Sequence, residues 1–149
     1  MNKIKKILKA TFYFILGIVI LNLIVDRFYF ITTSSHKQDA TRTIHSYTVK
    51  YIAAETMKCS LGETTAMNGN LICPELNAAN VVDAAVKTLT DKNPYSKKIN
   101  AVRISTSNTE DEDVGYVNLS ASGSDVVVKS CNKKPCKEKY KISNTVSIK

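Results

Sequence analysis

The hydrophobic pattern begins with a nearly continuous apolar stretch over residues 10–25. As a helix this stretch would be about 24 Å long, which is shorter than a hydrocarbon core of about 30 Å. Extending it to Ile31 gives about 33 Å. Arg27 then lies near the outer interface, where its side chain can extend toward water, and Tyr29 lies at the headgroup level. The pattern therefore predicts a transmembrane helix over residues 10–31.

Four lysines, at positions 3, 5, 6 and 9, precede this stretch, and only the Asp26–Arg27 pair follows closely. The positive-inside rule then places the N-terminus in the cytoplasm. We expect a cytoplasmic basic leader over residues 1–9, the membrane helix over 10–31 and an extracytoplasmic head over 32–149. A cleaved signal peptide is the alternative, but no clear small-x-small site follows Ile31, so we favour a retained anchor.

Two further helices are predicted in the head. Between residues 37 and 58 there is no Gly or Pro, and apolar positions recur at helical spacing, at Ala40, Ile44, Tyr47, Tyr51 and Ala54. This stem helix is expected to follow a break near residues 32–35. The second helix spans 77–89, with Ala78, Val81, Val82, Ala85, Val86 and Leu89 on one stripe. Asn77 or Asn80 can cap its start.

After Pro94 the pattern changes to a period of two, which predicts strands over residues 101–105, 114–120, 125–129 and 140–148. Short links join them: a turn at 108–113, another at 122–124, and a loop between Cys131 and Cys136. Helices followed by strands favour an α+β fold. We expect a four-stranded antiparallel sheet with the stem helix packed across it through Ile44, Tyr47 and Tyr51.

All four cysteines (Cys59, Cys73, Cys131 and Cys136) follow the predicted membrane span. An even number in a small exported domain indicates disulfides. Three connectivities are open, and we favour pairing of nearest neighbours, Cys59–Cys73 and Cys131–Cys136. Zinc is disfavoured, since no Cys-x-x-Cys pair is present and the only histidines, His36 and His45, lie on the stem.

The formal net charge of +8 is unevenly distributed. Lysines crowd the C-terminal tail, at positions 129, 133, 134, 137, 139, 141 and 149, against Glu138 alone. Lys133, Lys134 and Lys137 are candidates for a weak polyanion contact, although we favour the simpler interpretation that these lysines solvate the last loop and strand. The acidic run over residues 110–113 lacks the ligand spacing of a calcium loop, and we expect a solvated hairpin turn there.

Motifs of catalysis and cofactor binding are missing from the sequence. No Ser or Thr lies in a Gly-x-Ser-x-Gly motif, and no Gly-rich phosphate loop is present. We therefore expect no enzyme activity, no cofactor and no metal site.

The order of anchor, stem helix, cysteine-closed loop, sheet and C-terminal disulfide resembles a type IV pilin or pseudopilin. The segments 51–62, 67–73 and 113–131 resemble the head domain of marine bacterial pilin-like proteins. The resemblance implies a structural subunit of an extracellular filament or secretion pseudopilus, with a role in adhesion, motility, uptake or secretion. It also implies a membrane and copies of itself or other pilin subunits as partners. The expected location is the inner membrane, with a single span and an extracytoplasmic C-terminal domain, or an extracellular filament.

The N-terminus departs from the pattern of this family. Pilins carry a basic leader that ends in Gly or Ala, followed by Phe-Thr-Leu-Ile-Glu. Here Ala10 is the candidate end of a leader, but the next residues are Thr-Phe-Tyr-Phe-Ile, and Ile15 stands in place of the acidic fifth residue. The alternative function is therefore a membrane-tethered extracytoplasmic binding or scaffold protein, whose pilin-like head is not assembled into filaments.

Overall fold

The computed structural model describes residues 2–107 and 110–148, with side chains from residue 12 onward except at 30 and 31. Met1, Lys149 and the first two residues of the predicted 108–113 turn therefore lie outside the described residues, as do the side chains of the leader lysines and of Ala10. The chain divides into two compact units, of which the first ends at His36 and the second begins at Lys37.

Helix α1 (Asn2–Ser60) begins in the first unit, where large apolar side chains between Phe12 and Tyr29 are exposed. By length and composition it can cross a membrane. The break predicted near residues 32–35 is wrong, because α1 continues through them. The Thr33 hydroxyl donates to the Tyr29 carbonyl at 2.8 Å, and that of Thr32 to the Phe28 carbonyl at 3.0 Å. These bonds satisfy the hydroxyls within the helix, so the polar stretch does not end it.

In the second unit, α1 turns a largely polar stripe inward. Thr41, His45, Thr48, Ile52, Glu55 and Thr56 are all buried. Each of the first five follows directly after a member of the predicted apolar stripe. Ile44 and Tyr51 are half-buried against the core, but Tyr47 is 51% exposed, so the predicted packing through Tyr47 is wrong. The polar face can be buried because its groups find hydrogen bonds, which apolar periodicity cannot detect.

A small hairpin follows α1. Strands β1 (Thr65–Ala66) and β2 (Leu71–Ile72) pair antiparallel around a 3₁₀ turn, η1 (Met67–Gly69). Met67 is buried with φ +51°, and its N–H donates to the Glu55 carboxylate of α1 at 2.5 Å. A second 3₁₀ turn, η2 (Cys73–Glu75), begins at Cys73, which forms a disulfide with Cys59. Both links hold the hairpin against the end of α1.

Helix α2 (Ala78–Thr88) agrees with its prediction in position and packing. The Asn77 side chain caps it by accepting from the Asn80 N–H at 2.9 Å, which satisfies one of the unpaired donors of the first turn. The predicted stripe is buried except for Val86, which is half-buried, and Ala84 is buried as well. These residues form one core cluster with Ile52 of α1, Leu71 of β2 and the valines of the sheet.

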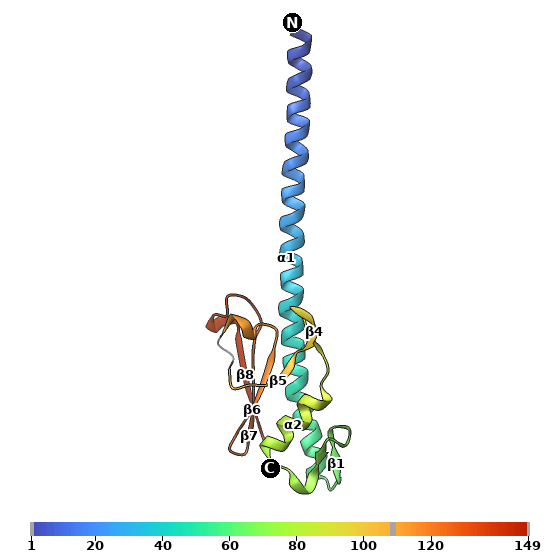
Figure 1. Ribbon diagram of the computed structural model, residues 1–149, viewed down its shortest axis with the longest axis vertical. Coiled ribbons are helices and arrows are strands. Elements are labelled where there is room, and N and C mark those ends of the chain that lie inside the picture. Colours follow the sequence, from blue (N-terminus) through green and yellow to red (C-terminus); the bar gives the residue numbers. More distant parts are fainter. Residues whose placement is uncertain (1, 108–109, 149) are drawn as a thin grey trace. The chain divides into compact units, whose positions relative to one another are not determined.

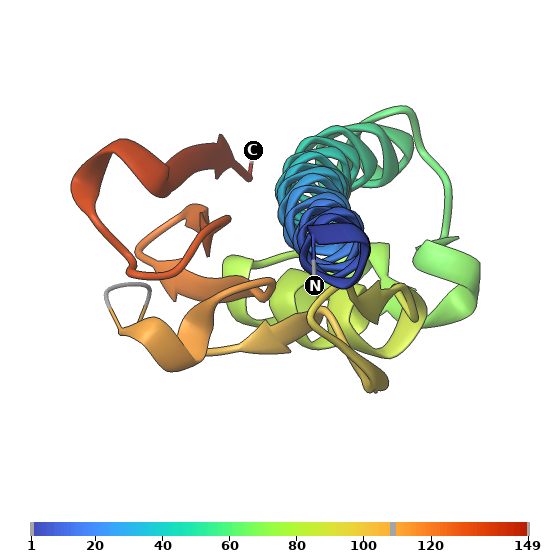
Figure 2. The same ribbon diagram turned by 90° about the horizontal axis from the view of Figure 1, so that it is seen from above.

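Two sheets follow α2 (Figure 1). Strands β3 (Lys92–Asn93) and β4 (Ser96–Asn100) form an antiparallel hairpin that the sequence pattern did not predict. The main sheet has the order β5-β6-β7-β8, with bounds Val102–Ile104, Val117–Ser122, Asp125–Cys131 and Lys141–Ser147. Strand β8 is at its edge, where Figure 2 shows it in dark red. The α+β class and the two disulfides are therefore present.

The main sheet is mixed, which corrects the prediction of a purely antiparallel one. Strands β6–β8 pair antiparallel, but β5 pairs parallel to β6, with Val102 opposite Val117. Parallel neighbours need a crossover much longer than a hairpin turn, and residues 105–116 provide it. This link contains a 3₁₀ turn, η3 (Asp111–Asp113). The acidic segment is thus part of a crossover and not a hairpin turn.

Candidate functional site

The C-terminal lysine loop, by which we mean residues 131–141, leaves β7 and leads into β8. It carries five lysines and one glutamate. The Cys131–Cys136 disulfide closes its first part, with the two Cα atoms 6.0 Å apart. The Asn132 N–H donates to the Tyr140 carbonyl at 3.0 Å. A short 3₁₀ turn, η4 (Glu138–Tyr140), completes the loop. These links fold the chain back, so that residues 132 and 140 are neighbours.

The β3–β4 hairpin supports one side of this loop. The Tyr95 hydroxyl donates to the Asn132 carbonyl at 2.6 Å, and the Tyr95 N–H donates to Asn93 Oδ1 at 2.8 Å. Burial raises the pKa of the Tyr95 phenol, so the hydroxyl keeps the proton that it donates. Asn93 is buried against Gly115, where an added Cβ would lie 2.3 Å from Asn93 Oδ1 and φ is +85°. Glycine is therefore required at this contact.

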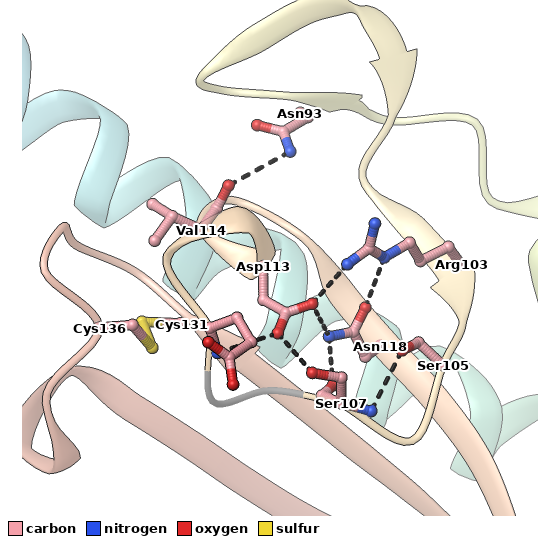
Figure 3. A network of polar contacts seen from close by, with 10 residues as sticks. Asn93, Arg103, Ser105, Ser107, Asp113, Val114, Asn118, Cys131 and Cys136 are labelled. Atoms are coloured by element: carbon pink, nitrogen blue, oxygen red, sulfur yellow. Dashed lines mark hydrogen bonds and ion pairs between the residues drawn. A yellow bond between two sulfur atoms is a disulfide. The ribbon is translucent and has the colours of Figure 1, made fainter.

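The acidic turn supports the loop from another side. Asp111 Oδ1 accepts from the Cys136 N–H at 2.7 Å. Two residues later, Asp113 is the centre of a polar network (Figure 3). Its Oδ1 accepts from Arg103 Nη2 at 2.5 Å and from Asn118 Nδ2 at 3.2 Å, and its Oδ2 accepts from the Ser107 hydroxyl at 2.7 Å. The network joins β5, the crossover and β6, and so fixes the turn that contacts Cys136.

Asp113 is 2% exposed, which is unusual for an aspartate and contradicts the expectation of a solvated acidic run at this one position, whereas Glu110, Asp111 and Glu112 are exposed. Burial alone would raise the pKa of its carboxyl. Hydrogen bonds from Ser107, the Glu110 N–H and Asn118, together with the positive charge of Arg103, outweigh burial and lower the pKa below its ordinary value. The guanidinium of Arg103 also lies over the Tyr116 ring, 3.6 Å from its centroid. Asp113 is therefore a charged structural residue.

Two lysines of the loop converge on one aromatic ring. Lys133 Nζ and Lys139 Nζ lie 5.2 and 5.1 Å from the centroid of the Tyr140 ring. Desolvation by itself would raise the pKa of the Tyr140 phenol, but the ammonium groups of Lys139 and Lys133 outweigh it and lower the pKa. Among the described residues, the acid of this loop, Glu138, pairs with Lys141 instead. Neither Lys133 nor Lys139 takes part in an ion pair with an acidic side chain in the part of the chain that the structure describes.

The structure places the three lysines selected from sequence on this loop, Lys133 half-buried and Lys134 and Lys137 exposed. Only Lys133 joins the cluster around Tyr140. Lys139 and Tyr140 were not selected, although Tyr140 is the only aromatic residue of the basic tail. The disulfides join Cys59 to Cys73 and Cys131 to Cys136, which is the nearest-neighbour pairing. Ala10 lies within α1.

The arrangement offers ammonium and hydroxyl donors on a supported loop. Within the part of the chain that the structure describes, no group of three or more His, Cys, Asp or Glu side chains is placed to hold a metal ion. A shallow hollow of about 300 Å³ near Arg103 is lined by Glu110, Glu112 and Asp113, but the Asp113 carboxylate is already occupied by its hydrogen bonds.

Comparison with protein-family models, curated proteins and solved structures found no match to this chain. Two features of the chain bear on its function: the exposed apolar segment of α1 and the supported C-terminal lysine loop.

Proposed function

We propose that this chain is a pilin-like structural subunit, anchored through α1 and assembled with copies of itself or with other pilin subunits. The observation that carries the proposal is that α1 combines an exposed apolar segment with a segment that belongs to the α+β unit. Between Phe12 and Tyr29 this helix exposes large apolar side chains, and from Lys37 onward its residues belong to the α+β unit. Exposed apolar surface of this extent needs a membrane or other helices to cover it.

The head is consistent with a surface module rather than an enzyme. Several of its buried polar side chains link one element to another, such as Glu55 with Met67 and Asp113 with Arg103. Its two disulfides close short loops, a device of small exported domains with modest cores. An external structural role uses these properties, because such a head must stay folded outside the cytoplasm.

A second candidate function is a membrane-tethered binding or scaffold protein that is never assembled. The residue that favours it is Ile15, which stands where pilins carry an acid that pairs with a neighbouring N-terminal amine during assembly. Without that carboxylate, the apolar segment is stable in lipid and has no charge that a partner must neutralise.

The mass of the mature chain tests the proposal. The full chain is expressed in a host with a pilus assembly system, and intact masses are measured in the membrane fraction and in sheared extracellular filaments. We expect part of the chain to lose residues 1–10 and to be recovered from the sheared fraction, while the rest stays intact in the membrane. An intact N-terminus, with all of the chain retained in the membrane, would exclude the filament subunit and leave the tether.

A further inference from the structure

The C-terminal lysine loop concentrates positive charge on a short segment of the chain. Lys133, Lys134, Lys137 and Lys139 lie within seven positions of one another, and no acidic side chain that the structure describes forms an ion pair with them. Like charges held close together repel each other. A surface that keeps such charges together on a constrained loop is one that an anion would stabilise.

The ammonium groups are held near one another by the fold. The Asn132 N–H donates to the Tyr140 carbonyl, and the Tyr140 N–H donates to the Lys137 carbonyl. The Cys131–Cys136 disulfide closes the first part of the same loop. Lys133 and Lys139 therefore extend over the same ring, although they are six positions apart. At these positions both ammonium groups lower the pKa of the Tyr140 phenol.

We infer that Lys133, Lys139 and Tyr140 form a binding site for the phosphate groups of a linear polyanion. Lysine ammonium groups are compact donors suited to phosphate oxygens, and the phenol hydroxyl supplies a further donor. The site is open to solvent, so a single phosphate group binds it weakly. A chain of phosphates binds more tightly, because several of its phosphate groups contact lysines at the same time. Lys134 and Lys137, both exposed on the same loop, extend the contact. This inference does not depend on assembly into a filament.

The test uses the full chain in non-ionic detergent and a labelled oligothymidylate as the probe, with fluorescence anisotropy at low and near-physiological salt. The variant Lys133→Gln with Lys139→Gln removes both converging charges. We expect it to weaken binding at low salt about tenfold and to reduce the salt dependence by about two released counterions. The matched control is Lys97→Gln with Lys98→Gln, two exposed lysines of β4, which should weaken binding less than about threefold.

Two further variants separate charge from folding. Lys133→Arg with Lys139→Arg keeps the charges and should keep most of the affinity, whereas Tyr140→Phe removes only the hydroxyl and should cost about threefold. Inorganic polyphosphate is used as a competitor. Displacement at equal phosphate concentration indicates recognition of phosphate chains in general, and failure to displace indicates recognition of nucleic acid. Both results support the site.

Three results would overturn the inference. In the first, the control pair loses as much affinity as the Lys133 and Lys139 pair, which would reduce the effect to net charge. In the second, neither polymer binds at low salt. In the third, the chain binds vesicles with anionic headgroups but neither polymer, so that the lysines contact a membrane surface instead.

Discussion

At the scale of single residues, His45 links parts of the second unit that are far apart in the sequence. It does not belong to the apolar stripe predicted for this helix. It is buried, and its Nε2 lies 2.8 Å from Asn144 Oδ1 of β8. Because a carboxamide oxygen can only accept, Nε2 carries the proton. Nδ1 then accepts from the Ser130 hydroxyl of β7 at 3.0 Å. The neutral ring thus connects α1 to the last two strands.

The stability of the second unit should depend on pH through His45. Burial lowers its pKa below the ordinary 6.5, against a smaller opposite effect of the Asn144 hydrogen bond. The unfolded chain therefore binds a proton more readily than the folded one. Stability is fully present above about pH 6.5 and decreases as the pH falls below it. Thermal unfolding of the full chain, measured from neutral pH to about pH 5, should show this loss.

His45→Gln should flatten that pH profile, because the amide offers a donor and an acceptor but does not titrate. His36→Gln, at an exposed position of α1, is the matched control and should leave the profile unchanged. At neutral pH, His45→Ala should lower the free energy of unfolding by about 1–3 kcal/mol, since the buried Ser130 hydroxyl loses its acceptor. An unchanged profile in His45→Gln would show that other groups cause the pH dependence.

At the scale of elements, the parallel pairing of β5 with β6 depends on the crossover between them. Asp113 holds that crossover by accepting from Arg103 of β5, from Ser107 of the link and from Asn118 of β6. A buried carboxylate without these donors would be strongly destabilising. Asp113 thus helps to hold the crossover that connects the parallel strands β5 and β6.

Asp113→Asn should therefore destabilise the chain by about 2–4 kcal/mol, because it removes the charge that compensates Arg103 and offers donors to groups that also donate. Glu112→Gln, at the exposed neighbouring position, should change stability by less than about 0.5 kcal/mol. Urea unfolding of both variants at neutral pH gives the comparison. Equal stability of the two variants would mean that the Asp113 network contributes nothing to the crossover.

At the scale of the whole molecule, the proposed function depends on what surrounds the apolar part of α1. The side chain of Ile15 is 60% exposed and apolar, in a segment exposed throughout Phe12–Tyr29. A carboxylate in a bilayer is costly and is tolerated where a partner charge neutralises it. A subunit that lacks this charge has less to gain by leaving the membrane for a filament.

Ile15→Glu together with Thr11→Phe should therefore increase processing and incorporation into a co-expressed filament. The measurement is the fraction of mature mass and the amount in sheared filaments, relative to the natural chain. Ile18→Glu with Thr11→Phe places the same charge at another exposed position of the segment and should give no increase. If the natural chain is already cleaved after Ala10 and abundant in filaments, the tether is excluded and the missing carboxylate is not limiting.

Local patterns were sufficient for the features that depend on nearby residues. The apolar segment of α1, the position and cap of α2, and the central and last strands follow from periodicity and capping, which need only a few neighbours in sequence. The loops that the cysteines close are also local. Part of the candidate site could be predicted in the same way, because Lys133 and the Cys131–Cys136 pair lie within one short segment of the sequence.

The tertiary structure alone decided which partners distant residues find. It turned the polar stripe of α1 inward, since Ser130 and Asn144 bond His45. It made β5 parallel to β6 and buried Asp113 between them. It also brought Lys139 and Tyr140 to Lys133 through the folded loop. Apolar periodicity scores each residue by its own polarity, whereas the burial of a polar group depends on hydrogen-bond partners supplied from far along the chain.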